Sequence, residues 1–466
     1  MNKKSILITI LSLCQASFIF AGGILTNTNQ SAHFIRMVAR DASLQIDAAY
    51  TNPAGLVKLN DGFHFSFSNQ SAFQTRTITS TFAPFAGYGG NATKEFKGTA
   101  SAPIIPSLQA AYKTGKWVLS GNIAVTGGGG KATFNDGLPS FESQLAVLPT
   151  AISAMGVPTT QYSVDAYMRG SSFIYGAQMG GSYAINDMFS AYAGFRLNIV
   201  NNGYEGYLKN VKVNPQHPLV NPTGGMMLAT DFLTAAGKPE LAAMVADREI
   251  DNKQTGWGVA PILGLNFNCK ALNIGMKYEF KTSLNVESKT IDGKDGGLAQ
   301  FKDGVNTPHD IPSLFTVGAS YQITPQFLAS VGYHHFFDSD AKMADDKQKF
   351  INGGTNEYLA GLEFRINSMF LVSAGGQITR YGVTDDYQKD LSFSINSYSI
   401  GFGGAVNVAK NVMINIGYFW TTYSDWDKEN AKYASIPGSD PVVYLSGKDV
   451  FSRTNKVFAA GVDFSF

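Results

Sequence analysis

The last ten residues, 457–466, constrain the fold of this chain more than any other stretch. Read with a period of two, Phe458, Val462 and Phe464 fall on one side and Asp463 falls on the other. Alternate residues of a β-strand point to opposite faces of the sheet, so this strand has one apolar, aromatic face and one small or polar face. A strand of a soluble sandwich and a strand of a membrane barrel both fit this description.

The same alternation recurs along the chain. In the clearest case, residues 272–281, Ile274 and Met276 share one face while Lys277 and Glu279 share the other. Buried charges need water or partners, so a sandwich core would not accommodate them, whereas a water-filled lumen would. Fourteen such strands are predicted, at 61–73, 104–113, 116–126, 166–184, 188–206, 254–267, 272–286, 311–323, 327–337, 354–366, 369–383, 392–408, 412–426 and 453–466.

The composition favours membrane-spanning strands over a soluble core. Charged residues make up 15% of the 466 residues and aromatic residues 12%, whereas soluble domains carry about 25% charged residues. The mean hydropathy is only -0.04, and no run approaches the roughly 20 apolar residues of a membrane helix. Strands that place an apolar side chain at every second position account for both observations.

Charge and cysteine content argue against other classes of protein. The formal net charge of +1 does not indicate a nucleic-acid partner. Cys14 lies in the expected signal peptide, which leaves Cys269 as the one thiol of the mature chain. No disulfide framework and no cysteine-based metal site are therefore expected. We also expect no cofactor and no enzymatic activity, because the spacing of the residues shows no recognisable catalytic arrangement.

The predicted connections alternate between short turns and long loops, as they do in transmembrane barrels. An even number of strands places both ends of the barrel on the same, periplasmic side. The expected fold class is an all-β membrane protein, a 14-stranded antiparallel transmembrane β-barrel at 60–466. Residues 1–21 are expected to be a secretory signal, with Lys3 and Lys4 before an apolar stretch and Ala21 at its end. Export predicts the outer membrane of a Gram-negative cell.

A barrel of this size is too wide for its own side chains to fill. Residues 22–59 precede the first strand and are the expected plug, an N-terminal helical hatch in which 32–44 have helical spacing. A proline fixes its own φ and keeps the residue before it out of the α region, and a glycine permits a turn. The hatch motif is therefore a rigid turn made of Asn52, Pro53, Ala54 and Gly55.

Two of the long outer loops, 127–165 and 207–253, are unusually apolar. Large exposed apolar patches mark binding surfaces, and methionine makes such surfaces adaptable. The second loop predicts a hydrophobic ligand groove formed by Met226, Met227, Phe232 and Leu233. In the alternative interpretation, helices of the two loops pack on each other and cap the barrel, and the two interpretations are compatible.

Three basic residues face the predicted lumen, namely Arg196, Lys277 and Arg365. The carboxylate of a ligand would bind to arginine or lysine there. In the alternative interpretation, these residues pair with the lumen carboxylates Glu279 and Glu363.

With these features the sequence resembles the FadL family of outer-membrane transporters for long-chain fatty acids and other hydrophobic compounds. The family has an Asn-Pro-Ala motif just before the first strand, as in Asn52–Gly55, and a terminal aromatic residue, here Phe466, which is the usual assembly signal for the barrel-assembly machinery. Further matching segments are Gly22-Gly23, Pro106-Ser107-Leu108, Ile311-Pro312-Ser313-Leu314 and Tyr321-Gln322-Ile323-Thr324-Pro325.

The resemblance implies a monomer with a hatch, in which apolar outer loops capture the substrate and a lateral opening at a kinked third strand releases it. Glycines weaken a β-ladder and mark bulges or bends. We therefore expect the lateral opening beside Gly127, Gly128, Gly129 and Gly130. In the alternative interpretation, these glycines simply begin a flexible loop.

The expected function is passive transport of hydrophobic compounds, with long-chain fatty acids as the first candidate, across a membrane that also contains outer-membrane lipid and lipopolysaccharide. A general diffusion porin and a surface adhesion or structural barrel are the alternatives. The hatch argues against a porin, and an adhesion barrel should have polar outer loops. The sequence does not distinguish a fatty acid from an aromatic hydrocarbon or another lipid.

Overall fold

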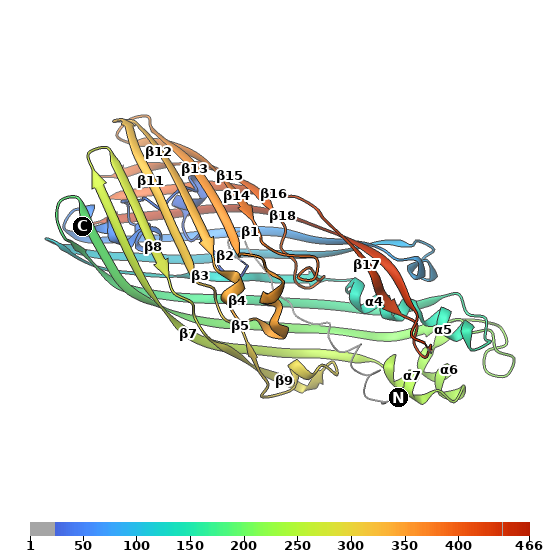
Figure 1. Ribbon diagram of the computed structural model, residues 1–466. Helices are drawn as coiled ribbons and strands as arrows, with labels where there is room; N and C mark the ends of the chain where they lie inside the picture. Colours follow the sequence, from blue (N-terminus) through green and yellow to red (C-terminus); the bar gives the residue numbers. More distant parts are fainter. Residues whose placement is uncertain (1–23, 440) are drawn as a thin grey trace.

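One antiparallel β-sheet forms the body of the molecule and closes on itself (Figure 1). The computed structural model describes residues 24–439 and 441–466, so the expected signal peptide lies outside the described residues, as do Gly22 and Gly23. β1 (Gly62–Thr81) pairs with β2 (Thr93–Thr114) on one side and with β18 (Tyr444–Ser465) on the other. Closure of this kind removes the free edges of a sheet.

The sheet contains eighteen strands, of which fourteen make up the barrel wall. Besides β1, β2 and β18, the wall contains β3 (Trp117–Phe134), β4 (Tyr162–Ala184), β5 (Phe189–Val213), β7 (Arg248–Cys269), β8 (Leu272–Glu279), β11 (Leu314–Thr324), β12 (Phe327–Phe336), β13 (Thr355–Arg365), β14 (Phe370–Arg380), β15 (Ser397–Ala409) and β16 (Val412–Tyr423). The other four strands extend the sheet at its outer end: β6 (Met227–Leu228), β9 (Asn285–Asp295), β10 (Asn306–Pro308) and β17 (Trp426–Ser435). The predicted 14-stranded barrel is confirmed.

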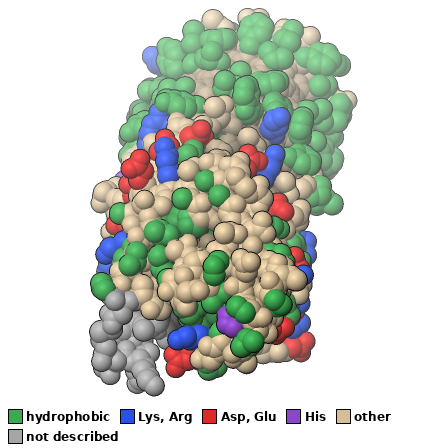
Figure 2. Space-filling view, turned by 90° about the vertical axis from the view of Figure 1, so that its right-hand side faces the viewer, with side chains coloured by type: hydrophobic (Ala, Val, Ile, Leu, Met, Phe, Trp, Pro, Cys, Tyr) green, Lys and Arg blue, Asp and Glu red, His purple; other side chains and the backbone are tan. Residues whose placement is uncertain are grey.

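Along each wall strand, side chains point alternately outward to the lipid and inward to the lumen. At the start of β1, Phe63 and Phe67 are exposed on the outer face, whereas His64, Ser66 and Ser68 are buried on the inner face. Figure 2 shows hydrophobic side chains crowded over one end of the molecule, with charged and polar side chains over the rest. An outward apolar band of this kind is what a lipid bilayer requires of a barrel.

The wall is taller on one side than on the other, as Figure 1 shows. The predicted strands 61–73 and 104–113 are too short, because β1 continues to Thr81 and β2 already begins at Thr93. These residues extend the ladder beyond the apolar band, where the outward side chains, such as Thr75 and Thr77, are polar. The apolar alternation that revealed the strand is lost there, although the backbone pairing continues.

The hatch fills the lumen with α2 (Ala32–Arg36), α3 (Ala48–Thr51) and the 3-10 helix η1 (Pro53–Lys58). All helical residues of the hatch except Lys58 are buried, and α2 packs against β14, β15, β16 and β18. The helix predicted from the spacing over 32–44 is too long. The observed helix ends at Arg36, because Met37 adopts extended backbone with φ -155° and ψ 104°.

Four short helices gather at the outer end of the tall wall (Figure 1). They are α4 (Pro139–Ala146), α5 (Leu148–Ala154), α6 (Ala229–Ala235) and α7 (Pro239–Met244), and the remaining 3-10 helices are η2 (Ala83–Gly87), η3 (Ala299–Phe301), η4 (Asp338–Asp340) and η5 (Ala344–Phe350). Residues of both predicted apolar loops share one buried cluster, so the predicted packing of these loops on each other is confirmed. None of the described helices has the length and apolar character needed to cross a membrane.

Candidate functional site

Arg36, at the end of α2, ties the hatch to the barrel wall. Its Nη1 donates to Glu363 Oε2 at 2.5 Å and to Ser373 Oγ at 3.0 Å, and its Nε donates to Asn415 Oδ1 at 3.0 Å. The side chain is fully buried. Three wall strands therefore hold one cation of the hatch through charge-assisted and neutral hydrogen bonds.

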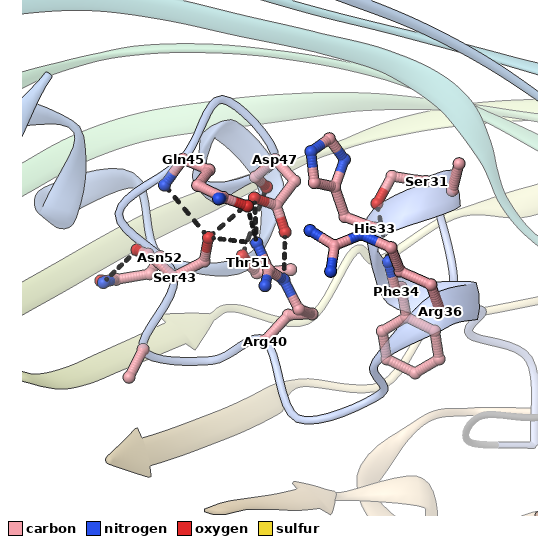
Figure 3. Close-up of polar contacts among 12 residues, drawn as sticks. Ser31, His33, Phe34, Arg36, Arg40, Ser43, Gln45, Asp47, Thr51 and Asn52 are labelled. Carbon is pink, nitrogen blue, oxygen red and sulfur yellow. Dashed lines mark hydrogen bonds and ion pairs between the residues drawn. The ribbon is translucent and has the colours of Figure 1, made fainter. Parts of the chain in front are cut away.

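A second arginine fixes the fold of the hatch itself (Figure 3). Arg40 donates from Nε to Asp47 Oδ2 at 2.7 Å and from Nη2 to Asp47 Oδ1 at 2.8 Å, and Ser43 Oγ donates to the same carboxylate at 2.7 Å. Burial alone would raise the pKa of Asp47, but the charge of Arg40 and these hydrogen bonds hold that pKa below its ordinary range. The pair locks the loop between α2 and α3.

The predicted hatch motif anchors the end of the plug. Asn52 leaves the helical region, with φ -145° and ψ 67°, and Pro53 begins η1, as the sequence predicts. Asn52 Nδ2 donates to Ser43 O at 3.0 Å and to Asn266 Oδ1 on β7 at 2.7 Å. A Cβ on Gly55 would lie 2.4 Å from Asn52 Nδ2, so glycine is required by this close approach.

The carbonyl groups of this motif are also bound by the wall. Ser182 Oγ on β4 donates to Pro53 O at 2.7 Å, and Ser190 Oγ on β5 donates to Ala54 O at 2.7 Å. Sequence reasoning missed both serines and Asn266. The one signal for the two serines is their place on the lumen face beside short turns.

The ladder between β2 and β3 is interrupted in its middle. Ala100 pairs with Ala132 and Leu108 pairs with Ile123, and no pairing links 101–107 with 124–131. On β2, Pro103 and Pro106 lack the N–H group that a ladder needs. The wall therefore lacks backbone hydrogen bonds at this place.

β3 bulges at the glycines that face this gap. Its residues Val125 and Gly130 pair with Tyr175 and Ser172 of β4, so five steps along β3 match three along β4. Gly128 has a φ of +88°, a backbone conformation that favours glycine. The expected bend at Gly127, Gly128, Gly129 and Gly130 is present in the strand, and its role as an opening remains a proposal.

The beginning of the hatch binds to this bulge. Thr26 forms a bridge with Gly127, and Asn27 N donates to Thr126 O at 2.8 Å. A Cβ on Gly127 would lie 2.0 Å from Leu25 O, so only glycine permits the contact. The plug and the interrupted ladder are therefore directly coupled.

An apolar pocket lies between the two outer loops, beyond the apolar band. It encloses about 100 Å³. Phe141 and Leu145 of α4 line one side, and Met244 at the end of α7 lines another. Further lining residues come from the wall and the neighbouring segments, and they include Met168, Leu208, Val211, Arg248, Ile250 and Leu298.

No protein-family model and no curated protein sequence matches the chain, but solved structures do. A FadL homologue from Pseudomonas aeruginosa aligns with a TM-score of 0.64 and 11% identity, over 96% of this chain and 100% of that one. This chain has the FadL fold. The toluene transporters TodX of Pseudomonas putida (TM-score 0.55, 15% identity, 94% of this chain and 99% of that one) and TbuX of Ralstonia pickettii (0.52, 14%, 90% and 94%) are also similar.

Within this FadL fold, two of the predicted lumen cations are already paired. Arg196 Nη1 donates to Glu279 Oε2 at 2.5 Å, and Lys277 Nζ donates to Glu279 Oε1 at 2.6 Å and to Tyr50 O of the hatch at 2.8 Å. Both cations are buried. Arg365 is exposed at the end of β13. The structure therefore favours the pairing interpretation for Arg196 and Lys277, whereas Glu363 pairs with Arg36 instead.

The predicted groove residues of the second loop occupy a different place. Phe232 and Leu233 are fully buried in the cluster between the outer helices, Met227 packs against that cluster and Met226 is exposed. The prediction that Phe232 and Leu233 form an open groove is wrong, because these side chains hold α6 against its neighbours. Met244 lines the pocket instead.

The predicted assembly signal closes the barrel. Phe466 N donates to Phe63 O at 2.8 Å, and Phe63 N donates to Phe466 O at 3.1 Å. The Phe466 ring is 73% exposed and stacks on Phe464. Its role in assembly remains a prediction.

Sequence reasoning also missed a buried histidine bridge. His334 Nε2 lies 2.8 Å from Asp41 Oδ1 of the hatch, and His334 Nδ1 lies 2.8 Å from Glu357 Oε2 of β13. A second histidine of the hatch, His33, lies 2.9 Å from Asp463 Oδ2 of β18. Ionisable groups thus join hatch and wall on several sides, and no spacing in the sequence reveals which partners meet.

Proposed function

We propose that this protein is a FadL-family channel of the Gram-negative outer membrane, without enzymatic activity, that passes hydrophobic small molecules from its outer pocket to a lateral opening between β2 and β3. The observation that carries this proposal is the interrupted β2–β3 ladder, whose glycine bulge is bound by the first residues of the hatch. A pore for polar solutes needs neither a gap in its wall nor a plug bound to it.

Entry begins at the apolar pocket between the outer loops. Its lining side chains, such as Phe141, Leu145 and Met244, can remove a ligand from water. Burial of each methylene contributes about 0.8 kcal/mol, so an alkyl chain of moderate length gains enough to leave the aqueous phase without an energy source. Arg248 also lines this pocket, so a polar headgroup would meet a cation there.

The ligand leaves the lumen through the gap between β2 and β3 and enters the lipid. On the inner side of the gap, Ile105 and Val125 belong to a buried apolar cluster with Phe34 of the hatch. On the outer side, Ile104 is 75% exposed. A hydrophobic ligand would therefore meet apolar side chains on both sides of the wall once the hatch segment 24–27 leaves the bulge.

Long-chain fatty acids are the substrates we propose first. TodX and TbuX are toluene transporters, so the same fold serves an aromatic hydrocarbon in those proteins. The proposal also includes a monomer that is inserted by the barrel-assembly machinery through its C-terminal strand and that lies among outer-membrane lipid and lipopolysaccharide.

A diffusion porin and an adhesion barrel remain the competing functions. A porin would keep its lumen charges in contact with water, whereas here Arg36, Arg196 and Lys277 are buried against the hatch and its partners. An adhesion barrel would not need the contact between Thr26 and Gly127. Both alternatives give different results in the following experiment.

The test removes the bulge. Deletion of Gly128 and Gly129 takes out the two residues by which β3 exceeds β4, so the strand can regain a regular ladder. We expect the purified variant to bind radiolabelled palmitate with the affinity of the wild type. Uptake by cells that lack other fatty-acid transporters should fall at least tenfold, because the ligand enters the pocket but cannot leave.

Deletion of Gly89 and Gly90 is the matched control, since both lie in an outer turn where added atoms would meet nothing within 4 Å. This control should retain both binding and uptake. Unchanged uptake by the bulge deletion would exclude the lateral route. Absence of palmitate binding by the wild type, together with a large ion conductance, would make the protein a porin.

A further inference from the structure

The outer loop between β14 and β15 folds into the barrel instead of lying on its surface. Loops generally face water, but residues 390–395 are all buried, as are Tyr387 and Gln388. The centre of the Phe393 ring lies 4.9 Å from that of Phe451 on β18, and Arg76 of β1 donates from Nη2 to Phe393 O at 3.3 Å. Because these contacts place residues 384–396 inside the lumen, we call them the lid segment.

The lid segment fills the way from the outer pocket to the gap in the wall. Met168 and Leu298, which line the pocket, belong to a buried apolar cluster. Ala100 and Ala132, the last β2–β3 pair above the gap, belong to the same cluster. The lid segment contributes three side chains to this cluster, namely Leu391, Phe393 and Ile395. A ligand that passes from the pocket to the gap therefore has to displace the lid segment.

The lid segment also packs with the start of the hatch. Tyr387 is fully buried and belongs to a second apolar cluster with Ile24 and Leu25. Leu25 O is the atom that lies closest to the position of a Cβ on Gly127. Movement of Tyr387 would therefore remove packing from the hatch residues that bind the β3 bulge.

A carboxylate of the lid segment binds the helix that lines the pocket. The side chain of Leu138, the residue before α4, forms no capping hydrogen bond. Instead, Asp390 Oδ2 accepts from Ser140 N at 2.9 Å. The free N–H groups at a helix N-terminus need acceptors, and a negative charge is favourable there. Because Ser140 and Phe141 also line the pocket, a ligand that displaces this turn of α4 breaks its bond to the lid segment.

The hydrogen bonds of the lid segment allow it to move as one unit. Within the segment, Gln388 Nε2 donates to Ser394 O at 2.6 Å, and Ser394 N donates to Gln388 Oε1 at 3.0 Å. Two bonds to the surroundings come from lysines, since Lys428 Nζ donates to Gln388 O at 2.8 Å and Lys347 Nζ donates to Ser392 O at 2.9 Å. Lysine has a flexible stem, so both side chains can follow a small displacement.

We propose that residues 384–396 are a lid between the outer pocket and the lateral opening, and that the bond from α4 to Asp390 is a latch that ligand in the pocket releases. This inference rests on the proposed function and adds a step to it, between capture and lateral release. A ligand shifts such an equilibrium only if it binds the open state better than the closed one. The closed lid occupies the space into which an alkyl chain would extend from the pocket, so a long-chain ligand favours the open state.

The first test measures whether a ligand opens the lid. In a Cys269→Ser background, Ser394→Cys places the one thiol of the mature chain on the lid segment, at a position that is 2% exposed. Its rate of reaction with a water-soluble maleimide is measured on the full barrel in a non-ionic detergent, with and without saturating palmitate. We expect palmitate to raise this rate at least tenfold. Ser399→Cys, equally buried on the adjoining β15, is the matched control and should react slowly in both conditions.

The second test removes the latch. Asp390→Ala deletes the acceptor, whereas Asp390→Asn keeps an oxygen that accepts from Ser140 N. Without ligand, Asp390→Ala should raise the maleimide rate of Ser394→Cys at least severalfold, and Asp390→Asn should raise it less. Because coupling between two equilibria is reciprocal, Asp390→Ala should also bind palmitate more tightly than the wild type does. Asp386→Ala changes an exposed side chain of the same segment and should match the wild type.

The outcomes separate the lid from the proposed function. Palmitate binding without faster labelling of Ser394→Cys would overturn the lid and leave the proposed function standing. An equal rise at Ser394→Cys and Ser399→Cys would also overturn it, because the wall would then loosen together with the segment. Weaker palmitate binding by Asp390→Ala would make Asp390 a structural residue and overturn the latch. Failure of the wild type to bind palmitate would overturn the proposed function, and the lid with it.

Discussion

The pair of Arg40 and Asp47 decides whether the hatch keeps its shape. The carboxylate is fully buried and bound through both oxygens. Burial is the largest single effect on its pKa and raises it, but the charges of Arg40 and His33 and the hydrogen bonds from Arg40 and Ser43 together hold the pKa below its ordinary value. A carboxylate with a lowered pKa in the folded state stabilises that state above its unfolded pKa, about 3.9, and loses this contribution as the pH falls below that value. Protection of the hatch should therefore be constant above about pH 5 and decline in more acidic solution.

This decline is measured by hydrogen exchange of peptides from 32–58 between pH 7 and pH 3, corrected for intrinsic exchange rates. Asp47→Asn leaves Arg40 buried without its counter-charge, which costs about 3–5 kcal/mol, so the variant should exchange faster at all pH values. Its acid transition should be smaller than that of the wild type, with the remainder due to the carboxylates that bind Arg36 and His33. Asp61→Asn removes a surface carboxylate that binds Lys113 and should leave the hatch unchanged. A wild-type hatch whose protection is the same at pH 3 and pH 7 would contradict the role of this pair.

Only part of the structure of the hatch could be predicted from its individual residues. The turn of Asn52 and Pro53 is local, because proline restricts itself and the residue before it, and it appears as predicted. The serines that bind its carbonyl groups, Ser182 and Ser190, lie more than a hundred residues away. A contact of that range depends on strand register around the barrel, which the sequence pattern does not contain.

In the proposed mechanism, release of the ligand depends on the bulge of β3. Gly127 touches the hatch backbone so closely that a methyl group would lie 2.0 Å from Leu25 O. Gly127→Ala must therefore displace either the hatch segment or the strand, and β4 holds the strand on both sides of the bulge, through the pairs Val125–Tyr175 and Gly130–Ser172. We expect faster exchange of the amides of 25–27 and at least a severalfold rise in the basal permeability of cells to a hydrophobic dye.

Gly181→Ala on β4 is the matched control, because a Cβ there would meet Val118 O at an ordinary 3.8 Å. It should match the wild type in both measurements. A Gly127→Ala variant with unchanged exchange at 25–27 would show that the bridge between Thr26 and Gly127 does not hold the hatch in place.

Strand number is predictable from the sequence, whereas strand length is not. Apolar alternation exists only where one face meets lipid, so all fourteen wall strands are recognised by that band. Above the band, β5 still runs to Val213 and β2 already begins at Thr93, but both faces are polar or mixed there and the pattern disappears. The outer pocket depends on these extensions and could be predicted only as a general apolar character of two loops.

The molecule as a whole combines a wide barrel with a polar plug. Hydrogen bonds and ion pairs from Arg36, Asn52 and Asp41 of the hatch reach β13, β7 and β12. Opening the lumen thus requires several buried polar contacts to break together. A ligand, or a substitution at one of these residues, can break a single contact without releasing the plug. Such an arrangement favours small displacements at the β3 bulge over expulsion of the hatch.

The plugged lumen predicts the ion conductance of the barrel. In planar bilayers the wild type should conduct few ions, because the hatch fills a lumen that fourteen strands alone would leave water-filled. Deletion of 24–58 should raise the single-channel conductance by about tenfold or more. Asn52→Ala loses hydrogen bonds to Ser43 O and Asn266 Oδ1. This variant should show brief openings, with a conductance between that of the wild type and that of the deletion variant. A wild-type conductance equal to that of the deletion variant would mean that the plug does not seal the lumen, and lateral release would then have no advantage over passage straight through the barrel.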